Sequence, residues 1–265
     1  KPNPILLNQL SNIFIMSKEW SAKNFALSPQ NWDAGQETFS ATNAMGTGPF
    51  KITLREPNTK TVFKKNGKWW GNVEHNITEI QLLPIKNAAT RVAALLSGEI
   101  DLVTDAPVQD LGRIESSAGH KVASTPQMRT IFLGMDQAVD KLRSGNTGDN
   151  PFKKKAVRQA LYQSIDIEAI KKKVMRGLSE PAGIITFPGV NGYTTDLDKR
   201  LPYDVDAAKK LLADAGYPNG FDVELRCPND RYVNDEAICT AVVGMFGKIG
   251  VNVNLFAQTK SKHFK

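Results

Sequence analysis

The sequence lacks the features that mark a membrane-spanning chain. It contains no run of about eighteen apolar residues, so no segment predicts a membrane-spanning helix. Its first residues, KPNPILLNQLSNIF, lack the long apolar core and the small-residue cleavage site of a signal peptide. The sequence therefore predicts either an intracellular protein or one whose start has been removed.

Cysteine and histidine are scarce, and neither forms a recognisable metal-binding or catalytic pattern. The two cysteines match no zinc or thioredoxin-like motif. The three histidines, His75, His120 and His263, are scattered along the chain. Motifs for a nucleophilic serine, a zinc protease and a phosphate-binding loop are absent as well. The sequence thus predicts no metal site, no cofactor and no catalytic residues.

The two cysteines, Cys227 and Cys239, have two interpretations. Cys227 falls on a predicted strand, which favours burial as a small apolar side chain. A disulfide between the two is the alternative in an oxidising compartment, and the sequence leaves it open.

Positively charged residues are present in moderate excess over negatively charged ones. Lysine and arginine number 34 against 27 acidic residues, which gives a net charge of +7. The lysine runs at 153–155 and 171–173 lie on predicted helices, where such runs are usually solvated. No nucleic-acid-binding motif accompanies them. We therefore expect no nucleic acid as a partner.

What the sequence does contain is a globular composition, 41% apolar and 23% charged, and a series of helix and strand patterns. Residues 203–220, YDVDAAKKLLADAGYPNG, predict a short helix that Asp204 or Asp206 caps and that ends at Gly216. Its predicted buried face is Ala207, Ala208, Leu211, Leu212 and Ala215.

Two stretches predict a strand–helix–strand crossover, which joins parallel strands. The first consists of a strand at 77–85, a helix at 88–98 and a strand at 99–103. The second consists of a strand at 221–227, a helix that begins at 234–236 and a strand at 251–256. We expect at least two separate mixed sheets, one around residues 50–105 and one around 221–256.

A helical region separates the two crossovers. Residues 150–166 predict one helix with a proline at its front, and Asp166 caps a second helix at 167–177. Residues 141–151 and the Pro- and Gly-rich residues 178–204 predict surface loops, and loops as long as the second are often functional.

Six segments within residues 46–255 form a recognisable series; in order they are GTGPF, NGKWWG, RVAALLSGEIDLV, FKKKAVRQALYQSID, YDVDAAKKLLADAGYPNGF and IGVNVNL. They resemble, in the same order, motifs of the family 5 extracellular solute-binding proteins, the oligopeptide-, dipeptide- and nickel-binding components of ABC importers. Two of them depart from the family: residues 66–70 read Asn-Gly-Lys-Trp-Trp instead of Asn-Pro-x-Tyr-Trp, and residues 164–167 read Ser-Ile-Asp-Ile instead of Ala-x-Asp-Arg.

The resemblance implies an α/β fold of the two-lobed, type II-like periplasmic binding protein class, with mixed sheets and flanking helices. Because family members are considerably longer, we expect an internal piece with an incomplete second lobe. Residues 1–20 would end a small inserted domain, 21–130 would form the middle segment of lobe one, and 131–265 the first part of lobe two. The second lobe would end just after a strand, and its unpaired sheet edge predicts self-association.

The resemblance also implies capture of a solute and not an enzyme. A peptide or similar small solute would bind in the cleft between the lobes and pass to the permease subunits of an ABC importer. The location would be periplasmic, or extracellular and membrane-anchored in a Gram-positive source. Residues 128–137, MRTIFLGMDQ, resemble the strand that crosses into lobe two, where a backbone group could pair with an extended peptide. The candidate ligand-binding residues are Arg129, Phe132, Gly134 and Asp136.

Three alternatives stay open at this point. Phe132 could belong to the core and Asp136 to a turn. The protein could be a two-lobed α/β hydrolase that uses dispersed acids, which a turnover screen would reveal. It could also be a basic nucleic-acid-binding protein, whose affinity would fall steeply with salt.

Overall fold

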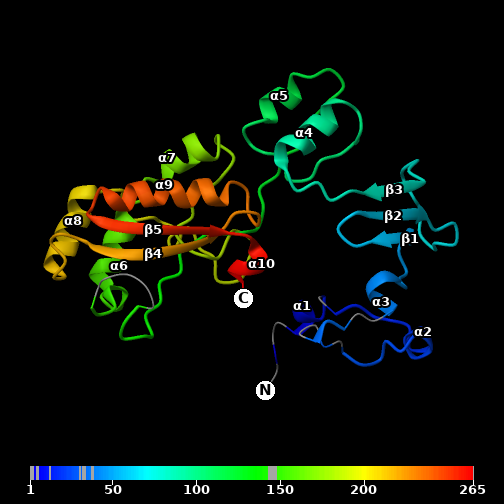
Figure 1. The fold of residues 1–265 in the computed structure, drawn as a ribbon, viewed down its shortest axis with the longest axis horizontal. Coiled ribbons are helices and arrows are strands. Elements are labelled where there is room, and N and C mark those ends of the chain that lie inside the picture. The colour runs from blue at the N-terminus through cyan, green and yellow to red at the C-terminus, as the bar shows by residue number, and fades with distance from the viewer. Residues whose placement is uncertain are drawn as a thin grey trace. The chain divides into compact units, whose positions relative to one another are not determined.

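The computed structural model describes residues 3, 6–11, 13–29, 31, 34–36, 39–142 and 148–264. The chain divides into two compact units, Lys1–Asn87 and Ala88–Lys265 (Figure 1). None of the helices in the described ranges has the length and apolar character needed to cross a membrane. The predicted boundary between lobes at residue 130 stays a prediction.

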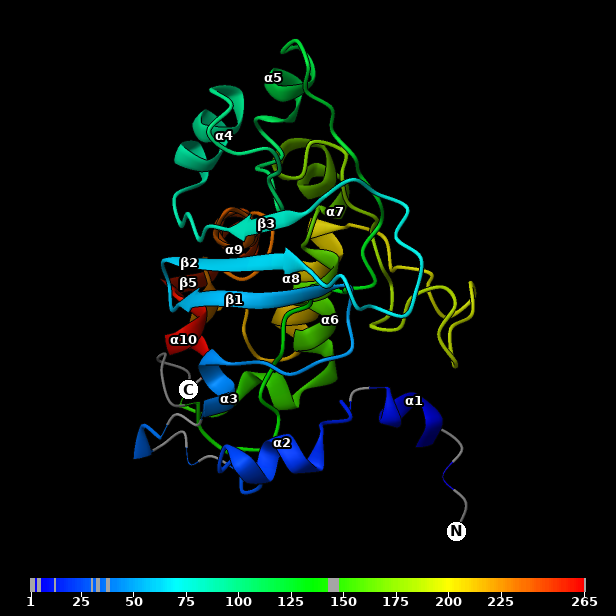
Figure 2. The same ribbon diagram turned by 90° about the vertical axis from the view of Figure 1, so that its right-hand side faces the viewer.

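The first unit combines short helices with an antiparallel sheet. The strands lie side by side in the order β1-β2-β3, as Figure 2 shows, and both pairs are antiparallel. Asn58 turns the chain between β1 and β2 with a φ of 61°, a conformation that asparagine tolerates better than most residues. The elements are α1 (Leu6–Leu10), α2 (Lys18–Lys23), α3 (Phe39–Thr42), β1 (Phe50–Glu56), β2 (Lys60–Lys65) and β3 (Glu79–Leu82).

The second unit places helices around a pair of parallel strands. β4 (Phe221–Pro228) and β5 (Val251–Gln258) pair in parallel, and α9 (Asp235–Gly247) connects them and runs alongside both (Figure 1). This confirms the second predicted crossover. The other elements are α4 (Ala88–Leu96), α5 (Leu111–Glu115), η2 (Pro151–Lys153), α6 (Lys155–Gln163), α7 (Ile167–Ala169), η3 (Ile170–Val174), α8 (Val205–Asp214) and α10 (Lys260–His263).

The core of the second unit lies where α6, α8 and α9 meet the two strands. Leu161 of α6, Leu212 of α8 and Val251 of β5 are almost completely excluded from solvent, at 2%, 0% and 0% exposure. Burial of this apolar surface is the main force that holds the helices against the sheet.

The predicted helix caps of this unit are confirmed. The Asp204 carboxylate accepts a hydrogen bond from the Ala207 N–H at 2.9 Å and so caps α8, whereas Asp206 lies within the helix. Asp166 caps α7 in the same way, because its carboxylate accepts from the Ala169 N–H at 2.9 Å.

Two glycines determine where β4 and β5 start relative to one another. Gly220 and Gly250 have φ values of 74° and 81°, a region that residues with a side chain rarely adopt. A Cβ atom on Gly220 would overlap the carbonyl group of Gly250, so the two turns touch backbone to backbone. The strands begin level as a result, with Phe221 opposite Val251.

The first predicted crossover is wrong in its second strand. β3 and α4 form, but residues 99–103 belong to no strand, and Leu102 is 79% exposed. Alternating apolar residues fit a strand, yet a strand also needs a hydrogen-bonding neighbour, and no described strand offers one here. The two separate sheets are present, but the prediction that they are mixed is wrong for the described strands: these pair only antiparallel in the first sheet and only parallel in the second.

Candidate functional site

Residues 128–137, called the crossing segment below, form an extended stretch with one side in the core. Leu133 and Met135 pack against the core of the second unit, whereas Phe132 is 61% exposed and Gly134 is also exposed. The alternation is that of a strand. The segment nevertheless pairs with no described strand, so the predicted crossing strand is wrong in that respect.

The backbone of the crossing segment is available for pairing. Within the described part of the chain, the N–H and C=O groups of residues 131–135 have no hydrogen-bond partner. Polar backbone groups that face solvent can exchange water for a ligand's own backbone groups. The segment therefore offers a row of donors and acceptors beside the exposed Phe132 ring.

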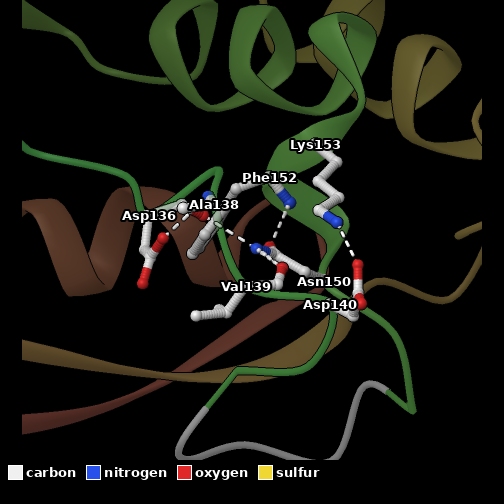
Figure 3. A network of polar contacts seen from close by, with 7 residues as sticks. All are labelled: Asp136, Ala138, Val139, Asp140, Asn150, Phe152 and Lys153. Atoms are coloured by element: carbon white, nitrogen blue, oxygen red, sulfur yellow. Dashed lines mark hydrogen bonds and ion pairs between the residues drawn. The ribbon is translucent and has the colours of Figure 1, made fainter.

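Asn150 joins the end of the crossing segment to the start of α6 (Figure 3). Its side chain is nearly inaccessible, with the residue 2% exposed. Its Nδ2 donates to the carbonyl oxygens of Asp136 at 2.8 Å and Val139 at 2.9 Å. Its Oδ1 accepts from the N–H of Phe152 at 2.9 Å, which caps η2. Asn150 therefore anchors the crossing segment to the helical region.

Asp136 and Asp140 both accept hydrogen bonds close to this anchor, and only Asp140 is ion-paired. The Asp136 carboxylate accepts from the N–H of Ala138 at 2.9 Å, which makes the tight turn that the sequence left as an alternative. Asp140 forms an exposed ion pair with Lys153 (Figure 3). The hydrogen bond from Lys153, together with its charge, lowers the pKa of the Asp140 carboxyl.

Arg129 extends the site toward the loop that connects β4 to α9. Its Cζ lies 5.7 Å from the centre of the Tyr232 ring, and the Cζ of Arg231 lies 5.0 Å from the same centre. Both guanidinium groups are thus in cation–π contact with one phenol. Neither arginine is ion-paired with an acid in the described ranges. Tyr232 therefore gathers two unneutralised positive charges beside the crossing segment.

Asp235 holds the loop that carries Tyr232. Its carboxylate accepts three backbone hydrogen bonds, from Arg231 at 2.9 Å, Tyr232 at 3.0 Å and Glu236 at 2.9 Å. Asp235 is 6% exposed, so these bonds take the place of water around its charge. The Tyr232 ring is consequently positioned by a fixed backbone.

The long loop at 178–204 meets the crossing segment at Thr130. The Thr130 hydroxyl donates to the carbonyl oxygen of Ile185 at 2.7 Å. The loop is organised by Asp198, which accepts from the Gly183 N–H at 2.6 Å and from the Tyr193 hydroxyl at 3.0 Å. The hydrogen bond from the Gly183 N–H is the largest cause that lowers the pKa of Asp198, and the hydrogen bond from the Tyr193 hydroxyl lowers it further. The hydrogen bond between Tyr193 and Asp198 also raises the pKa of Tyr193.

The four predicted residues thus lie on one segment that two loops flank. Arg129, Phe132 and Gly134 are accessible, and the alternative of Phe132 as a core residue is wrong. Sequence reasoning missed Tyr232, which no local pattern could link to residue 129. It also missed Asn150, although an Asn directly before a Pro-led helix is a typical cap signal.

The three histidines lie apart in the described ranges, and His263 packs against the ring of Phe264 while its buried Nδ1 has no hydrogen-bond partner there. His75 stacks on Phe50, and the His120 Nε2 lies 3.1 Å from the carbonyl oxygen of Leu95. Among the described residues, no group of three His, Cys, Asp or Glu side chains is placed to hold a metal ion.

Comparisons with known sequences identify the family. The model of "Bacterial extracellular solute-binding proteins, family 5 Middle" matches residues 1–264. Heme-binding protein A of Haemophilus influenzae is 27% identical over 228 residues, which cover 83% of this chain and 39% of that protein. The periplasmic murein peptide-binding protein MppA of Escherichia coli is 27% identical over 243 residues, which cover 89% of this chain and 43% of that protein. The chain thus spans about two fifths of the length of these relatives.

A solved structure shows the same fold. The ABC transporter-associated periplasmic binding protein DppA from Helicobacter pylori, in complex with the peptide STSA, aligns with a TM-score of 0.69 at 23% identity. The alignment covers 95% of this chain and 45% of that one. The predicted α/β fold of the type II periplasmic binding class is confirmed. Because the family model matches almost every residue of the chain, the protein belongs to the family 5 bacterial extracellular solute-binding proteins.

Proposed function

We propose that the protein captures a peptide or similar small solute outside the cytoplasm and delivers it to the permease of an ABC importer. The observation that carries the proposal is the unpaired backbone of residues 131–135 beside the exposed Phe132. An extended peptide can bind such a stretch as an added strand, with its own N–H and C=O groups. The murein peptide-binding relative and the peptide-bound structure support a peptide as the solute.

Each candidate residue has a distinct role in this proposal. Phe132 supplies apolar surface for a side chain of the solute. Gly134 leaves room for close approach, since a Cβ atom there would meet nothing within 4 Å. Arg129, placed by Tyr232, supplies a positive charge suited to a solute carboxylate. Asp136 adds a negative charge at the far end of the segment, suited to an amino group.

The test uses the full-length protein and starts from the solute that it retains. Mass spectrometry of purified protein would identify the solute, and calorimetry would then measure its affinity. We expect Phe132→Ala to raise Kd at least tenfold, or about 1.4 kcal/mol, without a change in melting temperature. Phe256→Ala is the matched control, because Phe256 is also a half-exposed aromatic residue of the same unit, at 45% exposure.

Two results would count against the proposal. Equal affinity of the wild type and Phe132→Ala for the solute would show that the crossing segment is not part of the binding site. A full-length protein that retains and binds no small solute would overturn solute capture itself.

Capture without turnover is part of the proposal. A screen of peptides and esters with the full-length protein should detect solute binding and no product above background. Product formation would favour the hydrolase instead. Cell fractionation should place the protein in the periplasm, or on the outer side of the membrane in a Gram-positive source.

A further inference from the structure

Two cysteines are buried inside the second unit, on a strand and on the helix that covers it. Cys227 lies on β4 and shares the inward side of that strand with Phe221 and Val223, which belong to the core. Cys239 lies near the start of α9, the helix that packs against β4. The two residues are only 4% and 8% exposed. A strand position and a helix position are thus brought together where the helix covers the sheet.

The two thiols lie close enough for each to act on the other, since each cysteine contributes to the shift in the other's pKa. Both are free thiols in the structure. The strand and the helix are joined by the loop at 229–234, whose backbone Asp235 holds in place. The two cysteines are therefore held near one another within a fixed local framework.

We propose that Cys227 and Cys239 form a disulfide bond in the exported protein. The inference rests on the proposed function in one respect, namely that the protein works outside the cytoplasm, where disulfides form and persist. As the S–S bond forms, the two thiols lose two protons and two electrons. The electrons pass to the disulfide of a thiol-exchange partner, a donor protein or glutathione disulfide, which is reduced to two thiols.

The surroundings of the pair indicate a structural bond and not a redox switch. Burial raises the pKa of both thiols, most of all that of Cys239. Little thiolate is then present in the folded protein, and the thiolate is the species that attacks a disulfide. The bond must therefore form during folding, before α9 covers β4. Once formed, it is shielded from reductants.

The bond would close the chain around residues 228–238, which include Tyr232 of the candidate site. A cross-link that closes a loop of this size favours the folded state by roughly a hundredfold in the unfolding equilibrium, in the chain-entropy view. It would thereby stabilise the backbone that carries Tyr232 against local opening.

The first test is a thiol map of the full-length protein exported by cells. Free thiols are trapped with iodoacetamide in denaturant at harvest, and the digest is analysed by mass spectrometry without reductant. We expect the peptides that contain Cys227 and Cys239 to be linked and unalkylated. Recovery of both cysteines in the alkylated form would overturn the proposal.

The second test compares stability with and without reductant in the same exported protein. We expect reductant, present throughout unfolding and refolding, to lower the urea midpoint of the wild type. The double variant Cys227→Ala/Cys239→Ala, which keeps both sites small and apolar, should show no such shift. A wild-type midpoint that is indifferent to reductant would overturn the proposal.

Calorimetry with the co-purified solute separates this inference from the proposed function. Alkylated cysteines in a protein that binds its solute would overturn the disulfide alone. Linked cysteines in a protein that binds no solute would support the disulfide and overturn solute capture.

Discussion

Replacement of Asn150 by Ala should destabilise the second unit and loosen the end of the crossing segment. The change removes the three side-chain hydrogen bonds to Asp136, Val139 and Phe152. Each such bond contributes about 0.5–1.5 kcal/mol, and the partners left without one add a desolvation cost. Because Asn150 is only 2% exposed, water cannot easily replace the amide. We expect the free energy of unfolding to fall by about 2–4 kcal/mol.

Urea denaturation followed by circular dichroism measures this change, with two variants for comparison. Asn150→Asp keeps the acceptor for the Phe152 N–H but loses both donated bonds and buries a charge, so it should be at least as destabilising as Asn150→Ala. Lys153→Ala removes only the exposed ion pair with Asp140 and should leave the midpoint unchanged. If Asn150→Ala and Lys153→Ala had the same small effect, the anchoring role of Asn150 would be refuted.

Two further predictions concern the helix face of α8 and the long loop. Leu212→Ala should lower the free energy of unfolding by about 2–5 kcal/mol because Leu212 is fully buried. Lys209 is exposed, so Lys209→Ala should change the free energy of unfolding by less than about 0.5 kcal/mol. Equal urea midpoints for the two variants would contradict the assignment of the buried face of α8. The pKa of Asp198 lies below its ordinary value of 3.8 in the folded protein, so its stabilisation is present above that value and is lost as pH falls through the lower folded pKa. Melts across this acidic range should show a steeper loss of stability for the wild type than for Asp198→Asn, and parallel curves would contradict the bonds from Gly183 and Tyr193.

Local signals in the sequence were sufficient for the α8 region and for β4-α9-β5. The cap at Asp204, the glycine after the helix and the alternation along residues 221–227 each depend on neighbours within a few residues. Such interactions are present in the segment itself, so they can be recognised before any tertiary contact is known.

Features that depend on distant partners could not be obtained in this way. Leu102 fits a strand pattern but has no neighbouring strand in the described ranges. Similarly, the side chains of the crossing segment alternate as in a strand, yet its backbone pairs with no described strand. Likewise, the contact between Arg129 and Tyr232 joins a segment and a loop that lie far apart along the chain. Periodicity reports which side of a segment is apolar, whereas pairing depends on what the rest of the chain brings beside it.

Gly220 and Gly250 decide which way Cys227 points. Successive side chains of a strand face opposite sides, so a slip of one residue between β4 and β5 would turn Cys227 away from α9 and bring Phe221 and Val223 toward solvent. The contact between the two glycine turns blocks that slip at the point where both strands begin. The direction of the Cys227 thiol, near the far end of the sheet, is therefore determined by two residues without side chains. A larger residue at either glycine would change the chemistry of the pair without touching a sulfur atom.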